Sequence, residues 1–91
     1  MKPGRQRLDK WLWFARFART RTLAARLVTE GYVRVNGKRA ESAATAIGLG
    51  DVLTVAAAHA TVTARVRDLG ERRGSAPEAQ TLYDIVGDTP G

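Results

Sequence analysis

The sequence predicts an α+β fold in which two N-terminal helices pack on a small antiparallel sheet and a C-terminal helix follows. Apolar residues recur at helical spacing on both sides of residue 20, Asn36-Gly37 marks a tight hairpin, and residues 61–67 alternate between apolar and polar. A length of 91 residues suits one domain with one modest core.

The N-terminal segment is expected to be a short arm followed by the first helix. Residues 1–6 are polar and contain Pro3-Gly4, which predicts a loose basic arm. The buried face of the first helix is predicted to contain Leu8, Trp11, Leu12 and Ala15. Asp9 lies in the first turn, where a carboxylate suits the helix dipole. We expect Asp9 to orient a neighbouring arginine instead of serving as a catalytic acid.

Three large aromatic residues, Trp13, Phe14 and Phe17, lie away from that face, so the first helix is predicted to be covered on two sides. For Trp13 and Phe14, burial against the last helix is favoured over stacking on an unpaired base, because large aromatic residues usually supply core area in small domains.

A second short helix is predicted to begin after Thr20, a natural N-cap. Its buried stripe is predicted to contain Leu23, Ala24, Leu27 and Val28. Gly31 supplies the stop, and residues 32–35 then alternate at period two. They run into Asn36-Gly37, the pair that best tolerates the positive φ values of a type I′ turn. A hairpin therefore follows the helix pair directly.

The remaining sequence predicts further strands and one helix. Residues 48–51 form a turn before a strand over 52–55, and residues 61–67 form another strand. Ser75 to Glu78 is typical of a capping box with proline in the first turn. The predicted C-terminal helix places Ala79, Leu82, Ile85 and Val86 on one side and ends at Gly87. We expect it to pack on the domain, because so short a helix is marginal alone in water.

Charge is strongly polarised along the chain. Residues 1–39 contain eleven Lys or Arg against two acids, a net charge of +9, whereas the remaining residues contain four Arg and seven acids, a net charge of −3. With 44% hydrophobic residues the chain can fold, so this charge lies on a folded surface. A compact cationic field most commonly attracts a phosphate backbone.

These features, in this order along the chain, resemble those of a known family, and the resemblance rests on a defined set of residues. Its residues are Arg7-Leu8-Asp9-Lys10-Trp11-Leu12, Arg16, Thr20-Arg21, Leu23-Ala24, Gly31, Val33, Val35-Asn36-Gly37, Gly50-Asp51 and Leu53. From Arg7 to about Val55 the chain resembles the RNA-binding domain named after small-subunit ribosomal protein four, also called the α-L motif. The resemblance implies a domain that binds structured RNA.

The rest of the chain is similar to a subfamily, the ribosome-associated small heat-shock protein fifteen. This similarity lies in Glu71-Arg72-Arg73-Gly74, Pro77-Glu78-Ala79 and Leu82-Tyr83. It implies binding to ribosomal RNA of the large subunit in a bacterium, in rescue or recycling of stalled subunits under stress. Some members carry a long basic tail that this sequence does not show, so functions of that tail are not expected. The expected layout is an arm over 1–6, the RNA-binding domain over 7–70, and a loop with the packed C-terminal helix over 71–91.

The basic residues of the N-terminal half form the candidate RNA surface. A face that served only solubility would mix acidic with basic residues, whereas only Asp9 and Glu30 are available to pair there. Arginine predominates, and its planar fork can grip a phosphate or stack on a base. The candidate RNA-binding residues are Arg5, Arg7, Lys10, Arg16, Arg19, Thr20, Arg21, Arg26, Arg34, Lys38 and Arg39. We expect one continuous exposed surface to hold Arg16, Arg19, Arg21, Arg34 and Lys38.

Two sets of residues within or beside this surface allow alternatives. Thr20-Arg21 occupies a helix N-terminus that favours an anion, while Thr20 can also serve only as a cap. Arg72-Arg73 lies in a loop, where solvation is favoured over a phosphate contact.

No cofactor, metal or catalytic site is expected. The chain has no cysteine, which excludes disulfides and thiol nucleophiles and fits a reducing compartment. His59 is the sole histidine and stands in a connector, so an exposed turn is favoured over a ligand or general base. Ser42 and Ser75 have no base beside them in any recognisable pattern. We expect a protein that is not an enzyme.

No apolar run approaches the length of a membrane span, and the first ten residues lack the apolar core of a signal peptide. We therefore expect a cytoplasmic monomer without a membrane partner.

Two other functions compete with this interpretation. A helix, a short turn and a basic second helix can imitate a DNA-binding helix-turn-helix. The hairpin directly after Gly31 argues against it, as does the lack of Asn or Gln on the second helix for reading bases. The chain can also be an accessory RNA-binding subunit of an RNA-modifying enzyme.

Overall fold

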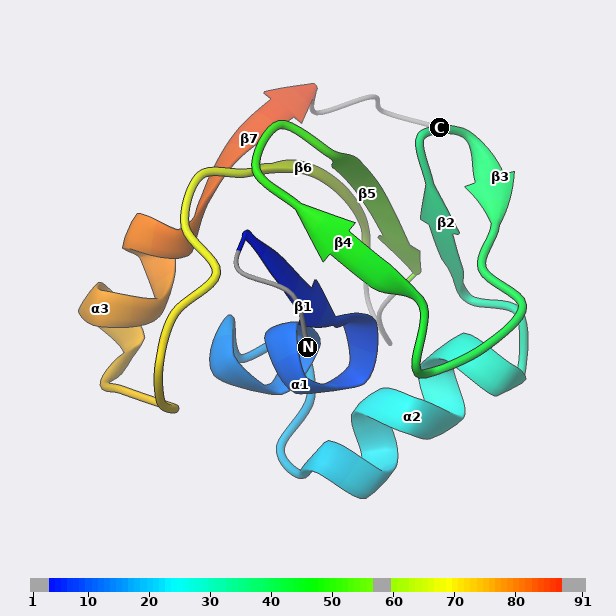
Figure 1. The fold of residues 1–91 in the computed structure, drawn as a ribbon, viewed down its shortest axis with the longest axis horizontal. Coiled ribbons are helices and arrows are strands. Elements are labelled where there is room, and N and C mark those ends of the chain that lie inside the picture. The colour runs from blue at the N-terminus through cyan, green and yellow to red at the C-terminus, as the bar shows by residue number, and fades with distance from the viewer. Residues whose placement is uncertain (1–3, 57–59, 88–91) are drawn as a thin grey trace.

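The computed structural model describes residues 4–56 and 60–87, and Figure 1 shows the two N-terminal helices below a curved sheet, with the C-terminal helix apart from them at one end of it. The elements in chain order are β1 (Arg5–Arg7), α1 (Leu8–Phe14), α2 (Arg21–Thr29), β2 (Val33–Val35), β3 (Lys38–Arg39), β4 (Ala46–Gly48), β5 (Val52–Ala56), β6 (Thr61–Val66), α3 (Ala76–Ala79), a 3-10 turn (Gln80–Leu82) and β7 (Tyr83–Gly87). The predicted α+β fold is confirmed.

The strands form two antiparallel sheets. The larger has the order β3-β2-β5-β6-β7, and the smaller pairs β1 with β4. In the larger sheet Arg34 lies opposite Arg39 on one side and opposite Thr54 on the other. Since opposite residues share a face, this register decides which side chains meet on the solvent side.

The second helix, α2, begins and ends as the sequence predicts. The hydroxyl oxygen of Thr20 accepts a hydrogen bond from the Leu23 amide at 3.0 Å, which caps α2. Gly31 adopts a φ of +90° after the helix, a conformation that side chains rarely allow. Of the predicted stripe, Ala24 and Val28 are fully buried, whereas Leu23 is exposed.

The hairpin turn also matches the expectation. Asn36 and Gly37 have φ values of 52° and 85°, as a type I′ turn requires. The Asn36 side chain donates to the Asp51 carboxylate at 3.2 Å and accepts from the Val52 amide at 2.9 Å. The turn is therefore tied to the start of β5, so the β2–β3 hairpin is held against the sheet.

Aromatic side chains from both ends of the chain meet in the core. Trp11 is fully buried and its indole N–H donates to the Asp68 carbonyl at 2.9 Å. Its ring lies 6.0 Å from that of Phe17 and 6.2 Å from that of Tyr83. Phe14 is also buried, while Trp13 is half-buried beneath the Arg73 guanidinium. The favoured burial of these aromatic residues is confirmed for Phe14 and holds in part for Trp13.

Part of the expected loose arm is a strand. Arg5 and Gln6 belong to β1 and pair with Gly48 and Ile47 of β4. The partner lies about forty positions along the chain, so no local pattern reveals the pairing. The strand fixes Arg5 and Arg7 at the start of α1 and so bears on the basic surface.

The predicted C-terminal helix is correct only in its first turn. Ser75 caps α3, but the helix ends at Ala79, and residues 83–87 form β7 along the edge of β6. Leu82 is buried, whereas Ile85 and Val86 are exposed. The apolar spacing fitted a helix, but β6 offers an open edge whose backbone groups need partners, and pairing with residues 83–87 satisfies them.

Candidate nucleic-acid interface

The buried carboxylate of Asp9 organises the cations at the start of the helix pair. Asp9 is only 4% exposed. One carboxylate oxygen accepts from Arg7 Nε at 3.1 Å and from the Lys10 amide at 2.8 Å. The other accepts from an Arg7 terminal nitrogen at 3.3 Å and from Arg21 Nε at 3.5 Å. The expectation that Asp9 orients an arginine is confirmed, for two arginines.

Electrostatics keep this carboxylate ionised. Burial raises the pKa of Asp9, but the hydrogen bond and charge of Arg7, the charge of Arg21 and the Lys10 amide outweigh burial, so its pKa lies below the usual value. The same carboxylate raises the pKa of Arg7. Both arginines retain partly exposed side chains, 42% for Arg7 and 44% for Arg21. Their remaining N–H groups are free to meet a phosphate.

Arg21 also opens α2, immediately after the Thr20 cap. The first turn of this helix holds no acidic residue. A cation at this end is disfavoured by the dipole, and Asp9 offsets that cost from the neighbouring helix. The capping role of Thr20 is thus shown. Beside it, Arg7 of β1 and Arg21 of α2 meet at Asp9 of α1, and together they form an arginine corner.

A second group of cations lies on the β2–β3 hairpin. Arg34, Lys38 and Arg39 are all exposed. Within residues 4–56 and 60–87, none of the three has a carboxylate within 4.0 Å. The Arg39 guanidinium packs on Gly31, at 3.0 Å from where a Cβ would lie. The hairpin therefore presents cations that no acid of the described chain neutralises.

The other candidate RNA-binding residues differ in the contacts that their side chains make. Arg5 lies 3.9 Å from the Asp51 carboxylate, and Arg26 bonds to Glu30 at 3.3 Å on the outside of α2. The Lys10 ammonium lies 5.6 Å from the centre of the Phe14 ring. Arg19 is exposed in the loop between the helices.

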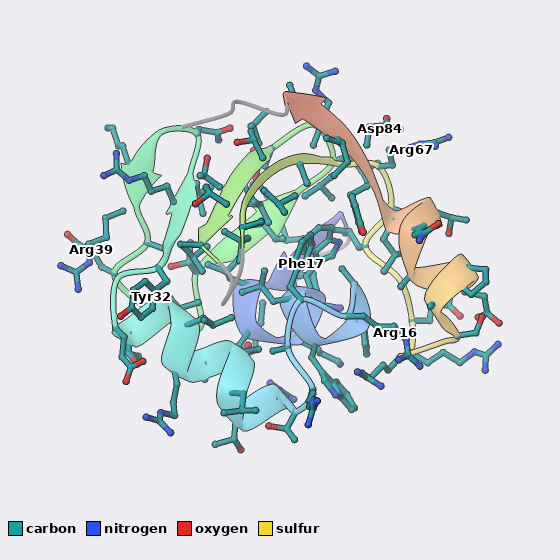
Figure 2. The ribbon with its side chains drawn as sticks, turned by 180° about the vertical axis from the view of Figure 1, so that it is seen from behind. Arg16, Phe17, Tyr32, Arg39, Arg67 and Asp84 are labelled. Carbon is teal, nitrogen blue, oxygen red and sulfur yellow. The ribbon has the colours of Figure 1, made fainter. Side chains whose placement is uncertain are left out.

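Arg16 does not join the hairpin surface. It has a φ of 64°, and its Nε donates to the Gly74 carbonyl at 3.0 Å. Figure 2 shows Arg16 beside α3 and Arg39 on the opposite side of the molecule. The expectation of one continuous surface is therefore wrong for Arg16, because its side chain joins the α1–α2 loop to the segment before α3.

Arg72 and Arg73 are held by contacts within the same region. Arg72 bonds to Glu78 at 3.4 Å, and Arg73 donates to the Trp13 carbonyl at 3.2 Å. These contacts agree with a structural role for the pair.

Tyr32 was not among the candidates, although its side chain is 49% exposed beside the cationic hairpin. The period-two pattern of residues 32–35 was the signal that places it on the same face as Arg34.

Among residues 4–56 and 60–87, no group of three His, Cys, Asp or Glu side chains is placed to hold a metal ion. His59 lies outside the described residues. No helix in the described part of the chain has the length and apolar character needed to cross a membrane.

Comparison with known proteins identifies the helix pair and the hairpin. The S4 domain model matches residues 6–53, from β1 into β5. The chain belongs to the S4 domain family. The resemblance to the ribosomal protein four type of domain is thereby confirmed, and the helix pair leads into an S4 hairpin instead of a helix-turn-helix.

Similar proteins cover most of the chain. The heat shock protein 15 homolog of Aeromonas salmonicida is 42% identical over 78 residues, which are 86% of this chain and 58% of that protein. The RQC P-site tRNA stabilizing factor of Bacillus subtilis is 35% identical over 80 residues, 88% of this chain and 91% of that protein. This chain thus spans 58% of the length of the heat shock protein 15 relatives and nearly all of the Bacillus subtilis factor.

A solved structure agrees with the fold. Vibrio cholerae heat shock protein 15, described as trimeric, is 40% identical, with a TM-score of 0.85 over 90% of this chain and 82% of that chain. This confirms the similarity to the heat shock protein 15 subfamily. The expectation of a monomer finds no support in that comparison.

Proposed function

We propose that this protein binds structured RNA on the ribosome through the S4 domain, without catalysing a reaction. The observation that carries the proposal is the Asp9 carboxylate, which holds Arg7 and Arg21 together with their outer N–H groups exposed. Two guanidinium groups held at one corner can bind successive phosphates with little loss of side-chain freedom. The proposed contact residues are Arg5, Arg7, Lys10, Arg16, Arg19, Thr20, Arg21, Arg26, Arg34, Lys38 and Arg39, with Arg16 at the margin.

Shape and phosphate spacing are the features that such a surface can read. A-form RNA hides the base edges of its major groove, and arginine forks suit the phosphates that flank it. We assign the binding partner as ribosomal RNA of the large subunit, in rescue or recycling of stalled subunits in a bacterial cytoplasm. The names and similarity of the heat shock protein 15 relatives support a role under stress.

A transfer RNA is the second candidate partner. It is favoured by one observation, namely that the relative of nearly equal length is named a P-site tRNA stabilizing factor. Both partners present A-form phosphates, so the same arginine corner serves either. The two assignments differ in whether binding to the large subunit depends on an occupied P site.

Cosedimentation with purified ribosomal particles tests both assignments. We expect the wild-type chain to sediment with large subunits and not with small subunits. Binding that rises when a transfer RNA fills the P site supports the second partner, and binding that is unchanged supports ribosomal RNA alone. A gel shift with a structured RNA and a duplex DNA of equal charge supplies the control. Equal affinity for RNA and DNA would contradict the proposal.

A further inference from the structure

The outer face of the β2–β3 hairpin combines an exposed aromatic ring with paired arginines. Tyr32 precedes β2, and its carbonyl accepts from the Ala56 amide at 2.8 Å, which continues the pairing with β5. Side chains alternate along a strand, so Tyr32 and Arg34 share one face while Val33 is buried on the other. Figure 2 shows Tyr32 and Arg39 together at this end of the molecule.

The ring of Tyr32 makes few specific contacts. Its side chain is 49% exposed. Within the described part of the chain, it has no aromatic partner, no cation over its face and no hydrogen bond from its hydroxyl. By contrast, Tyr83 lies 5.1 Å from Phe17 and 6.2 Å from Trp11, ring to ring. Tyr32 therefore offers an aromatic surface that the fold itself does not use.

The neighbouring charges favour an anion. Arg34 and Arg39 lie directly opposite each other on adjacent strands. Like charges in that position repel and destabilise a sheet. No carboxylate of the described residues lies within 4.0 Å of either guanidinium. The Arg39 guanidinium is seated against Gly31, the residue before Tyr32, and Figure 2 shows Tyr32 and Arg39 at the same end of the molecule.

We propose that Tyr32 is a stacking platform for one unpaired RNA base, whose flanking phosphates bind Arg34 and Arg39. A nucleotide supplies an aromatic plane and an anion a few ångströms apart, which matches the ring and the two cations. Stacking on an aromatic side chain is sequence-tolerant, whereas paired bases are unavailable for it. The site would thus select bulged or single-stranded positions within a structured RNA. This inference rests on the proposed RNA binding and adds a preference to it.

The test compares two hairpin RNAs of the same length, one fully paired and one with a single bulged 2-aminopurine. We expect the wild-type chain to prefer the bulged RNA and to quench the 2-aminopurine fluorescence. Tyr32→Ala should weaken binding of the bulged RNA by roughly one order of magnitude and remove the quenching, since stacking contributes that much per base. The dependence of affinity on salt should stay the same, because no charge is lost.

Matched variants separate stacking from other effects. Tyr32→Phe keeps the ring and should bind as wild type, and Leu49→Ala removes another exposed apolar side chain, 64% exposed, without effect. Arg39→Ala should reduce the salt dependence instead. If Tyr32→Ala binds both RNAs as wild type does, or loses affinity equally for both, the stacking site is overturned while RNA binding stands. If wild type does not distinguish RNA from a duplex DNA of equal charge, the proposed function itself fails.

Discussion

Asp9 binds two arginines that come from different elements, Arg7 from β1 and Arg21 from α2. It is 4% exposed and accepts hydrogen bonds from Arg7, Lys10 and Arg21. An isolated buried carboxylate would be costly, and these donors offset the cost. In return, the carboxylate restricts the two guanidinium groups to one corner. We infer that Asp9 is a positioning residue for the proposed interface.

Asp9→Asn should lower the free energy of unfolding at pH 7 by about 1–2 kcal/mol, because it removes charge-assisted hydrogen bonds from a buried group. The pKa of Asp9 is lowered in the folded protein, so its stabilising contribution is complete above the unfolded pKa of about 4 and is lost as pH falls through the folded pKa. The difference between the two proteins should therefore be constant above about pH 5 and shrink below about pH 4. Urea unfolding across this pH range measures it.

Asp84→Asn is the matched control. The Asp84 carboxylate bonds to Arg67 at 3.3 Å, with both side chains more than half exposed. Exposed pairs contribute little, so this change should cost less than about 0.5 kcal/mol. Equal losses in the two variants would show that burial of Asp9 has no energetic consequence.

The C-terminal segment shows how an element can change type within a few residues. Ser75 accepts from the Glu78 amide and starts α3. After the 3-10 turn, the Leu82 carbonyl accepts from the Arg67 amide at 2.8 Å, and β7 then pairs with β6. Leu82 packs near Phe14 and Gly70 in the core, whereas Ile85 faces solvent. The segment is part of the fold through its strand and one buried side chain.

Leu82→Ala should destabilise the protein by about 2–4 kcal/mol, because it opens a cavity in the core. Ile85→Ala should cost less than about 1 kcal/mol, because that side chain is already 55% exposed. Thermal unfolding of the two variants gives the comparison. Similar losses would mean that residues 83–87 bury Ile85 as a helix would, contrary to the strand.

Across the molecule, the cations fall into groups with different partners. Asp9 holds one group near β1 and α2, while the β2–β3 hairpin carries another without acidic partners in the described residues. Figure 2 shows Arg67 with Asp84 on the side away from Arg39. Arg39 of the basic part of the sequence and the Arg67–Asp84 pair of the acidic part thus lie on different sides, whereas Arg16 of the basic part lies beside α3.

Arg21→Ala should weaken RNA binding by about 1–3 kcal/mol and reduce the slope of log affinity against log salt by roughly 0.7–0.9, as expected for one lost phosphate contact. Arg21→Lys keeps the charge but not the fork, so it should retain the slope and still lose affinity. Filter binding at several salt concentrations measures both quantities. Arg67→Ala, in the acidic part of the sequence and paired with Asp84, should leave both unchanged. Equal losses at Arg21 and Arg67 would indicate diffuse attraction without an organised site.

Features that depend on neighbouring residues were predictable. The Thr20 cap, the Asn36-Gly37 turn and the alternation of residues 61–67 all follow from local backbone preferences and periodicity. In the structure Ala64 and Val66 of that strand are buried and Val62 is half-buried. Asp9 as a partner for arginine was also predictable, because a carboxylate in a basic helix start has few other roles.

Features that join residues far apart in the sequence were not predictable. β1 pairs with β4 and β7 with β6 because open strand edges satisfy their backbone groups on whichever segment the fold brings near. The spacing of Leu82, Ile85 and Val86 suits a helix, and only the edge of β6 decides for a strand.

By itself, the sequence determined where charge concentrates, where helices begin and where the chain turns, since these depend on residue type and short-range geometry. Only the tertiary structure decided which cations are held and which are free. Arg21 reaches Asp9 across 12 positions, and Arg16 reaches the Gly74 carbonyl across 58. Contacts of such separation depend on how helices and strands pack, so periodicity along the chain carries no record of them.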